Sequence, residues 1–116
     1  MTEEMKKLEY ILNYFGIESQ LDKLTEEANE VFKAGIIFEA SDYNKELTKR
    51  GRRNHIIEEI ADLEIVLEQI RLNYEITIDE EGHWRKQKLD RTINRIKTGY
   101  YEEDKNKYNS LWLDAN

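Results

Sequence analysis

The stretch IIEEIADLEIVLEQI, residues 56–70, is apolar on two sides when successive residues are placed about 100° apart, as in an α-helix. One stripe consists of Ile56, Ile60, Leu63, Val66, Leu67 and Ile70, and the other of Ile57, Ala61 and Ile65, continued just beyond the stretch by Leu72. A helix that is apolar on two sides is expected to be buried on two sides. We therefore expect a helix from an N-cap at Asn54 to about Tyr74, with a second subunit packed against its second stripe.

Two acidic side chains interrupt the first of these stripes. On the same helical wheel Glu59 falls between Val66 and Ile70, and Asp62 lies at the border of the stripe. A charged carboxylate in an apolar layer is very unfavourable unless a cation or several hydrogen-bond donors accompany it. Within this helix the sequence has no lysine or arginine before Arg71. The pattern therefore indicates that a cation comes from elsewhere.

A second acidic motif with the same spacing lies in LTEEANEVF, residues 24–32. It places Glu26, Glu27 and Glu30 on a predicted helix from about Glu18 to Phe38. We expect these glutamates to lie across from an apolar stripe, which by itself is typical of a solvated face. That stripe consists of Leu21, Leu24, Ala28, Val31 and Phe32.

The two acidic helices together predict a metal site. If they pack antiparallel, Glu27 and Glu30 can approach Glu59 and Asp62, so that four carboxylates surround one space. Hard oxygen ligands of this kind suit Mg²⁺, with Mn²⁺ as a substitute. Mg²⁺ keeps several of its positions for water and substrate phosphates.

The rest of the chain completes an all-α prediction. Zero prolines and 37% charged residues favour helices. We expect a first helix from about Glu3 to Phe15 and a fourth from about Trp84 to Lys97, in a four-helix core and a single domain over residues 1–116. Residues 39–53, which end in the basic run KRGRR, and residues 75–83 are predicted connections. The tail from about residue 100 is left without an assigned element, as either a contact in an oligomer or a disordered segment.

Composition limits the classes of function. The formal net charge of −7 argues against wrapping a nucleic-acid backbone, which requires a basic surface. The 116 residues contain no cysteine, which excludes disulfides and thiolate metal sites. The sequence has neither a signal peptide nor an apolar run long enough to span a membrane, so we expect no membrane partner and a cytoplasmic protein.

The motifs carry a resemblance to a known family. EEANE at residues 26–30, followed by EIAD at residues 59–62, resembles the EExxE…ExxD signature of the MazG-like all-α nucleotide pyrophosphohydrolases, a group that includes dimeric dUTPases and dCTP pyrophosphatases. The similarity extends from about Ile17 to Tyr101. It implies Mg²⁺-dependent hydrolysis of a nucleoside triphosphate to the monophosphate and pyrophosphate, in a homodimer or homotetramer. The metal ligands it implies are Glu27, Glu30, Glu59 and Asp62, and Glu26 is implied as a further ligand or as the group that orients the attacking water.

Candidates for substrate contacts lie outside the acidic motifs. Lys88, Arg91 and Arg95 form one basic face of the predicted fourth helix, opposite its apolar residues. Such a face can contact phosphates, or it can be an ordinary solvated surface. Gln20 and Asn94 have side chains able to hydrogen-bond a nucleobase, although a surface amide is the simpler interpretation of each.

A different class of function stays open at this point. The chain can be interpreted as a non-catalytic, acidic helical module whose carboxylates are only solvated. The two hypotheses differ in one observable, because only the enzyme releases pyrophosphate from a nucleotide when Mg²⁺ is present.

Overall fold

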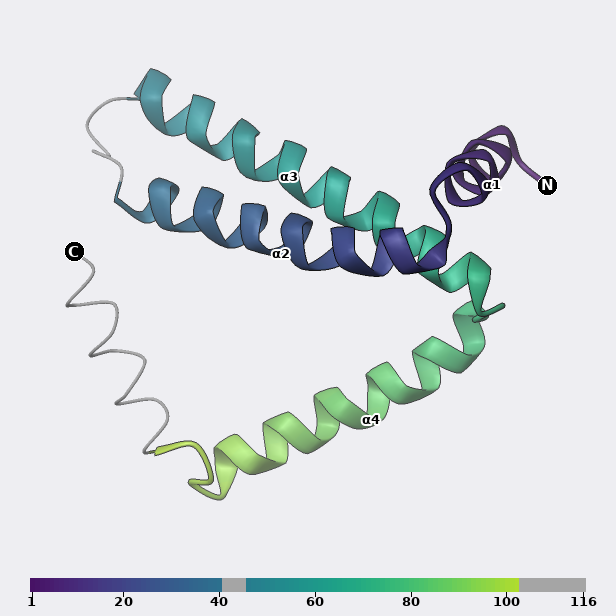
Figure 1. Ribbon diagram of the computed structural model, residues 1–116. Coiled ribbons are helices and arrows are strands. Elements are labelled where there is room, and N and C mark those ends of the chain that lie inside the picture. Colours follow the sequence, from purple (N-terminus) through teal and green to yellow (C-terminus); the bar gives the residue numbers. More distant parts are fainter. Residues whose placement is uncertain (41–45, 103–116) are drawn as a thin grey trace. The chain divides into compact units, whose positions relative to one another are not determined.

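The protein is all-helical in the residues that the structure describes. The computed structural model describes residues 1–40 and 46–102, which contain four α-helices and no strand. The helices are α1 (Glu3–Phe15), α2 (Ile17–Glu39), α3 (Glu46–Asn73) and α4 (Ile78–Lys97) (Figure 1). The prediction of an all-α chain is confirmed for these residues. None of the described helices is long and apolar enough to cross a membrane.

The chain divides into two compact units. The described residues up to 76 form the first unit and contain α1, α2 and α3, whereas the described residues from 77 onward form the second and contain α4. No residue of α4 is buried. A four-helix core and a single domain over residues 1–116 therefore stay predictions, and the predicted oligomer contact of the tail beyond Glu102 lies outside the described residues.

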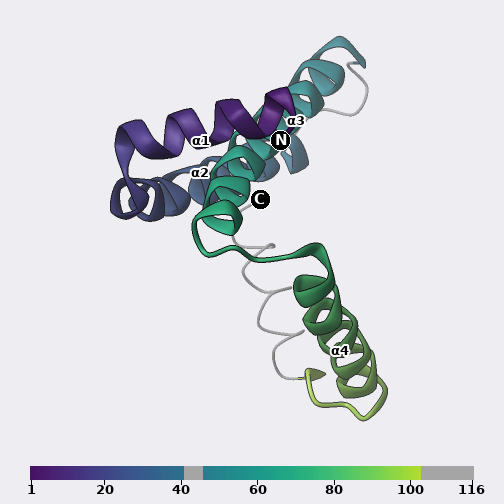
Figure 2. The ribbon, with the colours of Figure 1, turned by 90° about the vertical axis from the view of Figure 1, so that its right-hand side faces the viewer.

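In the first unit α2 and α3 lie side by side and run in opposite directions (Figures 1 and 2). Antiparallel packing of the two acidic helices, which the sequence analysis assumed, is thus observed. The residues buried where the helices of this unit meet are few, and two of them are polar. They are Leu8 and Leu12 of α1, Gln20 and Ala34 of α2, and Val66 and Gln69 of α3.

The face of α2 that meets α3 differs from the expected one. Leu21 and Phe32 of the predicted apolar stripe are exposed, while Gln20, Glu27 and Ala34 are turned inward. These three residues follow one another at intervals of seven, which keeps them on one side of a helix. The prediction was wrong because it used apolar side chains alone to find the buried face, and two of the inward positions are polar.

A single glycine joins α1 to α2. The amide of Gly16 donates to the carbonyl of Leu12 and ends α1, and α2 begins at the next residue. The backbone of Gly16 has φ 85° and ψ 156°, a region that is essentially restricted to glycine. The turn lays α1 across α2 and α3, as Figure 2 shows.

Two predicted helix starts were wrong. α3 begins at Glu46, so Asn54 lies inside the helix, and the whole basic run KRGRR belongs to α3 and is no connection. Arg52 accounts for part of this extension, because its Nη1 donates to the carbonyl of Ile37 near the end of α2, at 3.1 Å. α4 begins at Ile78, inside the predicted linker, where Thr77 and Glu80 form a reciprocal capping box.

The end of α3 is closed by a left-handed residue. The amide of Ile76 donates to the carbonyl of Arg71, and the amide of Glu75 donates to that of Leu72. This pair of bonds is a Schellman motif, in which the first residue after the helix C-cap takes a positive φ. Glu75 occupies that position with φ 54°.

Candidate metal site and adjoining pocket

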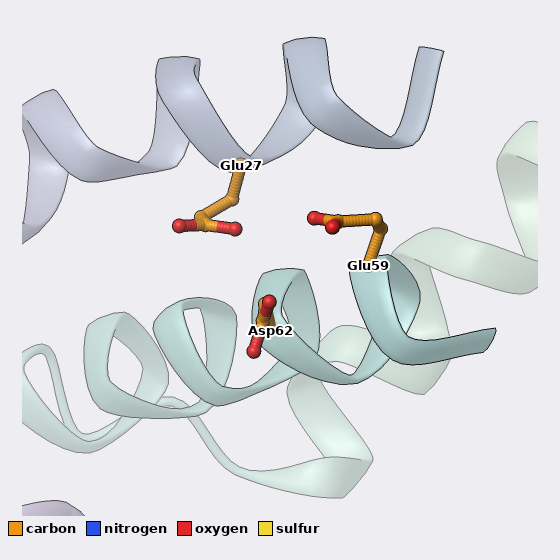
Figure 3. Close-up of side chains that lie close together, drawn as sticks. All are labelled: Glu27, Glu59 and Asp62. Atoms are coloured by element: carbon orange, nitrogen blue, oxygen red, sulfur yellow. The ribbon is translucent and has the colours of Figure 1, made fainter. Parts of the chain in front are cut away.

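Three carboxylates meet between α2 and α3. Glu27 of α2 and Glu59 and Asp62 of α3 each offer an oxygen within 4.8 Å of the others. Figure 3 shows the side chains of Glu27 and Glu59 reaching into the space between the two helices, with Asp62 beside them on α3. The side chains of Glu27 and Glu59 are only 12% and 15% exposed, while Asp62 is an exposed residue. We refer to Glu27, Glu59 and Asp62 as the acidic triad.

A basic residue precedes each glutamate of the triad by one helical turn. Nζ of Lys23 lies 3.4 Å from Glu27, and Nε2 of His55 lies 3.8 Å from Glu59, a contact that is ionic only when the imidazole is protonated. Both basic side chains are about half exposed. A basic residue that precedes its glutamate by four positions is in the weaker of the two orientations for such a pair. These contacts therefore offset only part of the repulsion within the acidic triad.

The donor set of the triad fits a hard divalent cation. All of its candidate ligand atoms are carboxylate oxygens, which Mg²⁺ and Mn²⁺ prefer over nitrogen or sulfur. Two oxygens on one Mg²⁺ lie at most about 4.2 Å apart, twice the bond length of about 2.1 Å. Adjacent oxygens on an octahedral Mg²⁺ lie only about 3.0 Å apart, so the triad oxygens, which lie within 4.8 Å of one another, would move closer together to bind one ion.

The other acids of the two motifs lie outside the triad. Glu30 forms an ion pair with Lys33 at 3.7 Å, and its side chain is 48% exposed. Glu26 and Glu58, the first acids of their motifs, are exposed. The roles of Glu30 as a ligand and of Glu26 near the attacking water stay predictions.

A pocket of about 310 Å³ opens beside the triad, and Glu27 and Asp62 form part of its wall. All three helices of the first unit line it. Its apolar wall consists of Ile11, Phe15, Ile65 and Val66. Its other polar lining residues are Gln20, Lys23 and Gln69. The volume is at the lower end of the range for small-molecule sites, and an apolar wall with a few placed polar groups is typical of them.

Two buried amides line this pocket. Gln20 and Gln69 are 2% and 1% exposed, and Nε2 of Gln20 donates to Oε1 of Gln69 at 2.6 Å. Nε2 of Gln69 in turn donates to the carbonyl of Ile65 at 3.2 Å. The interpretation of Gln20 as a surface amide is thereby wrong, while its role as a base contact stays a prediction.

The predicted phosphate contacts lie in the second unit. Lys88 and Arg91 line a pocket of about 270 Å³ together with Trp84 and Gln87. The guanidinium of Arg95 lies 4.7 Å from the centroid of the Tyr100 ring. These residues and the exposed Asn94 belong to α4, so their relation to the acidic triad stays a prediction.

Two residues of this region, Lys23 and Gln69, were not predicted from the sequence. Lys23 precedes Glu27 by four residues, a spacing that is visible in the sequence. Gln69 follows Asp62 by seven residues, which places both near one side of the helix. A polar residue in phase with a buried stripe was the signal that could have identified Gln69.

Comparisons with protein-family models, with curated proteins and with solved structures give no match to this chain. The geometry of the first unit and the motifs in the sequence are thus the basis for a functional assignment.

Proposed function

We propose that this chain is a Mg²⁺-dependent nucleoside triphosphate pyrophosphohydrolase of the cytoplasm, with a role in removing unwanted nucleotides. Hydrolysis between the α and β phosphates consumes one water and yields the nucleoside monophosphate and pyrophosphate. The observation that carries the proposal is the acidic triad, two of whose members, Glu27 and Asp62, line a pocket with an apolar wall and buried amides. The resemblance of the EExxE…ExxD motif to the MazG-like enzymes supports the same reaction.

The residues of the first unit divide into two groups by chemistry. Glu27, Glu59 and Asp62 would hold Mg²⁺, with Glu30 as a fourth ligand. A bound divalent cation neutralises charge on the phosphate oxygens and lowers the pKa of a coordinated water. Glu26 orients the attacking water. In the adjoining pocket the apolar wall packs against the faces of the nucleobase, and the side chain of Gln20 forms a hydrogen bond with the edge of the base.

The basic face of α4 supplies contacts to the phosphates. Lys88, Arg91 and Arg95 offer positive charge, and the two guanidinium groups can each grip two phosphate oxygens. Trp84 lies beside Lys88 and Arg91 in one pocket and gives that surface an aromatic wall. An anionic substrate with a ring suits such a surface better than an uncharged one.

The test is pyrophosphate release from a panel of ribo- and deoxyribonucleoside triphosphates, common and damaged, with Mg²⁺ and with excess chelator. We expect release from at least one nucleotide, with the monophosphate as the other product and no release after chelation. Release of orthophosphate instead would place the cleavage at the wrong bond. A panel without any Mg²⁺-dependent hydrolysis would overturn the proposed activity.

We further propose that the enzyme works as a homodimer or a dimer of dimers. Large apolar side chains of α2 and α3 are exposed in the single chain, among them Phe32, Ile57, Ile60 and Ile65. Exposed apolar area of this kind usually marks an interface. Ile65→Lys should dissociate the assembly, as measured by light scattering at micromolar concentration. A wild-type protein that is monomeric in that measurement contradicts the proposal.

A further inference from the structure

The hydrogen bonds of the two buried glutamines have a direction. The carbonyl of Ile65 can only accept, so Gln69 must turn its NH₂ group toward Ile65. The side-chain oxygen of Gln69 then faces Gln20, and Gln20 must turn its own NH₂ group toward that oxygen. The backbone of α3 thus fixes the orientation of both amides.

The side-chain oxygen of Gln20 is left without a donor. Among the described residues it accepts no hydrogen bond, although Gln20 is 98% buried. Every side-chain nitrogen or oxygen of these residues that is shut off from solvent has a hydrogen-bond partner. The oxygen of Gln20 must therefore reach solvent, and the space that Gln20 lines is the pocket beside the acidic triad. A buried acceptor that opens onto a pocket is a place for a ligand's donor.

We propose that Gln69 is a positioning residue that makes the pocket selective for ring edges bearing an N–H group. It does so by holding Gln20 with its oxygen toward the ligand. If Gln20 turned over, its oxygen would face the oxygen of Gln69, and two acceptors would meet without a proton between them. The inference rests on the proposed function in taking the ligand to be a nucleotide, but it concerns binding and not hydrolysis.

The test uses nucleoside 5′-monophosphates, whose binding is followed by NMR titration without turnover. The bases uracil, cytosine, adenine and guanine all carry an N–H donor on their pairing edge. The rings 2-pyrimidinone and unsubstituted purine carry only acceptors there. We expect the best-bound common base to bind at least fivefold more tightly than the donor-free ring of the same size. We call this ratio the donor preference.

Two substitutions at Gln69 separate positioning from simple packing. Gln69→Met removes the acceptor that holds Gln20, so Gln20 can present either group and the donor preference should fall below about twofold. Gln69→Glu keeps an oxygen toward Gln20 and, with its carboxyl protonated, an O–H donor toward the carbonyl of Ile65, so it should keep the donor preference. Gln20→Met should abolish the preference while the apolar wall still binds the rings, and it tests the proposal independently if Gln69→Met does not fold.

The outcomes decide the inference separately from the proposed function. Loss of the donor preference in Gln69→Met together with its retention in Gln69→Glu supports the positioning role. The inference is overturned by a wild type without the preference, by a preference that Gln69→Met leaves unchanged, or by equal loss in both variants. A protein that shows the expected ranking but hydrolyses no triphosphate would refute the proposed activity alone.

Discussion

The acidic motifs of α2 and α3 share one spacing in the sequence but have different surroundings in the fold. On α3 the second and third acids, Glu59 and Asp62, both belong to the acidic triad, whereas on α2 only the second acid, Glu27, does. The third acid of α2, Glu30, is paired with Lys33 nearer the solvent. Spacing alone therefore does not say which carboxylates meet.

The difference arises from the rotation of each helix about its own axis. Gln20 and Ala34 mark the inward side of α2, and Glu27 lies midway between them in sequence on that side. Three further residues turn the helix by about 300°, which moves Glu30 about 60° away from Glu27. On α3 the inward side is marked by Val66 and Gln69. Glu59 precedes Val66 by seven residues and Asp62 precedes Gln69 by seven, so both acids lie near that side. The lesson is that the phase of a motif relative to the buried face decides its chemistry.

The largest expected effect compares the two glutamates of α3. Glu59→Gln should lower Mg²⁺-dependent turnover by more than about a hundredfold, since even outer-shell partners of metal ligands contribute ten- to a hundredfold. Glu58→Gln is the matched control on the exposed side and should stay within threefold of wild type. The measurement is steady-state pyrophosphate release, with circular dichroism to check the fold. Equal losses in the two variants would mean that the wrong acid has been assigned.

The next comparison is between the second and third acids of α2. Glu27→Gln should cost as much as Glu59→Gln, because both side chains lie inside the triad. Glu30→Gln should lower turnover less, by about tenfold, because Glu30 lies outside the triad in the metal-free protein. Its exposed pair with Lys33 is worth little, so Glu30 can leave it to reach the metal. The Mg²⁺ dependence of the rate measures both. If Glu30→Gln is as damaging as Glu27→Gln, the two motifs are equivalent once the metal is bound.

A smaller effect is expected for the basic residues that precede the two triad glutamates. Lys23→Met should raise the KM for the nucleotide several-fold, because Lys23 also lines the pocket. His55→Gln should change KM less than twofold, because His55 is not among the residues that line this pocket. Initial-rate kinetics at saturating Mg²⁺ separate the two. A larger effect on KM for His55→Gln than for Lys23→Met would indicate that the substrate binds beside Glu59 and not in this pocket.

The smallest expected effect concerns stability without metal. In the absence of Mg²⁺, Glu27→Gln should raise the free energy of unfolding by on the order of 1 kcal/mol, because it removes a charge repelled by Glu59 and Asp62. Glu26→Gln removes the same charge from an exposed position and should leave stability nearly unchanged. Urea unfolding in excess chelator gives both values. A destabilised Glu27→Gln would show that its contact with Lys23 outweighs the repulsion.

Much of this arrangement follows from the sequence, but not its polar parts. The spacing of apolar residues predicted four helices, and the place of Glu59 within an apolar stripe predicted its inward position. The buried face of α2 was not predictable from apolar residues, because Gln20 and Glu27 occupy positions that a pattern search assigns to solvent. Their burial depends on partners in α3, which only the packed pair of helices supplies.

The helix ends show the same division between local and long-range causes. The start of α4 could have been predicted, because Thr77 and Glu80 have the spacing of a capping box within four residues of sequence. The start of α3 could not, because the basic run there is polar and includes Gly51. A contact from Arg52 to the distant Ile37 helps to hold it against α2. The positive φ of Glu75 could likewise not be predicted, because residues other than glycine, asparagine and aspartate rarely adopt it.

The one-residue joint at Gly16 limits how this chain can change in length. α1 and α2 have no spare residue between them, and α1 carries Ile11 and Phe15 to the wall of the pocket. An insertion or deletion at the joint would have to be absorbed by rotating or shifting a whole helix, by about 100° and 1.5 Å for each residue. Either movement would carry Ile11 and Phe15 away from Gln20. We therefore expect related sequences to vary in length elsewhere and to keep this joint at a single glycine.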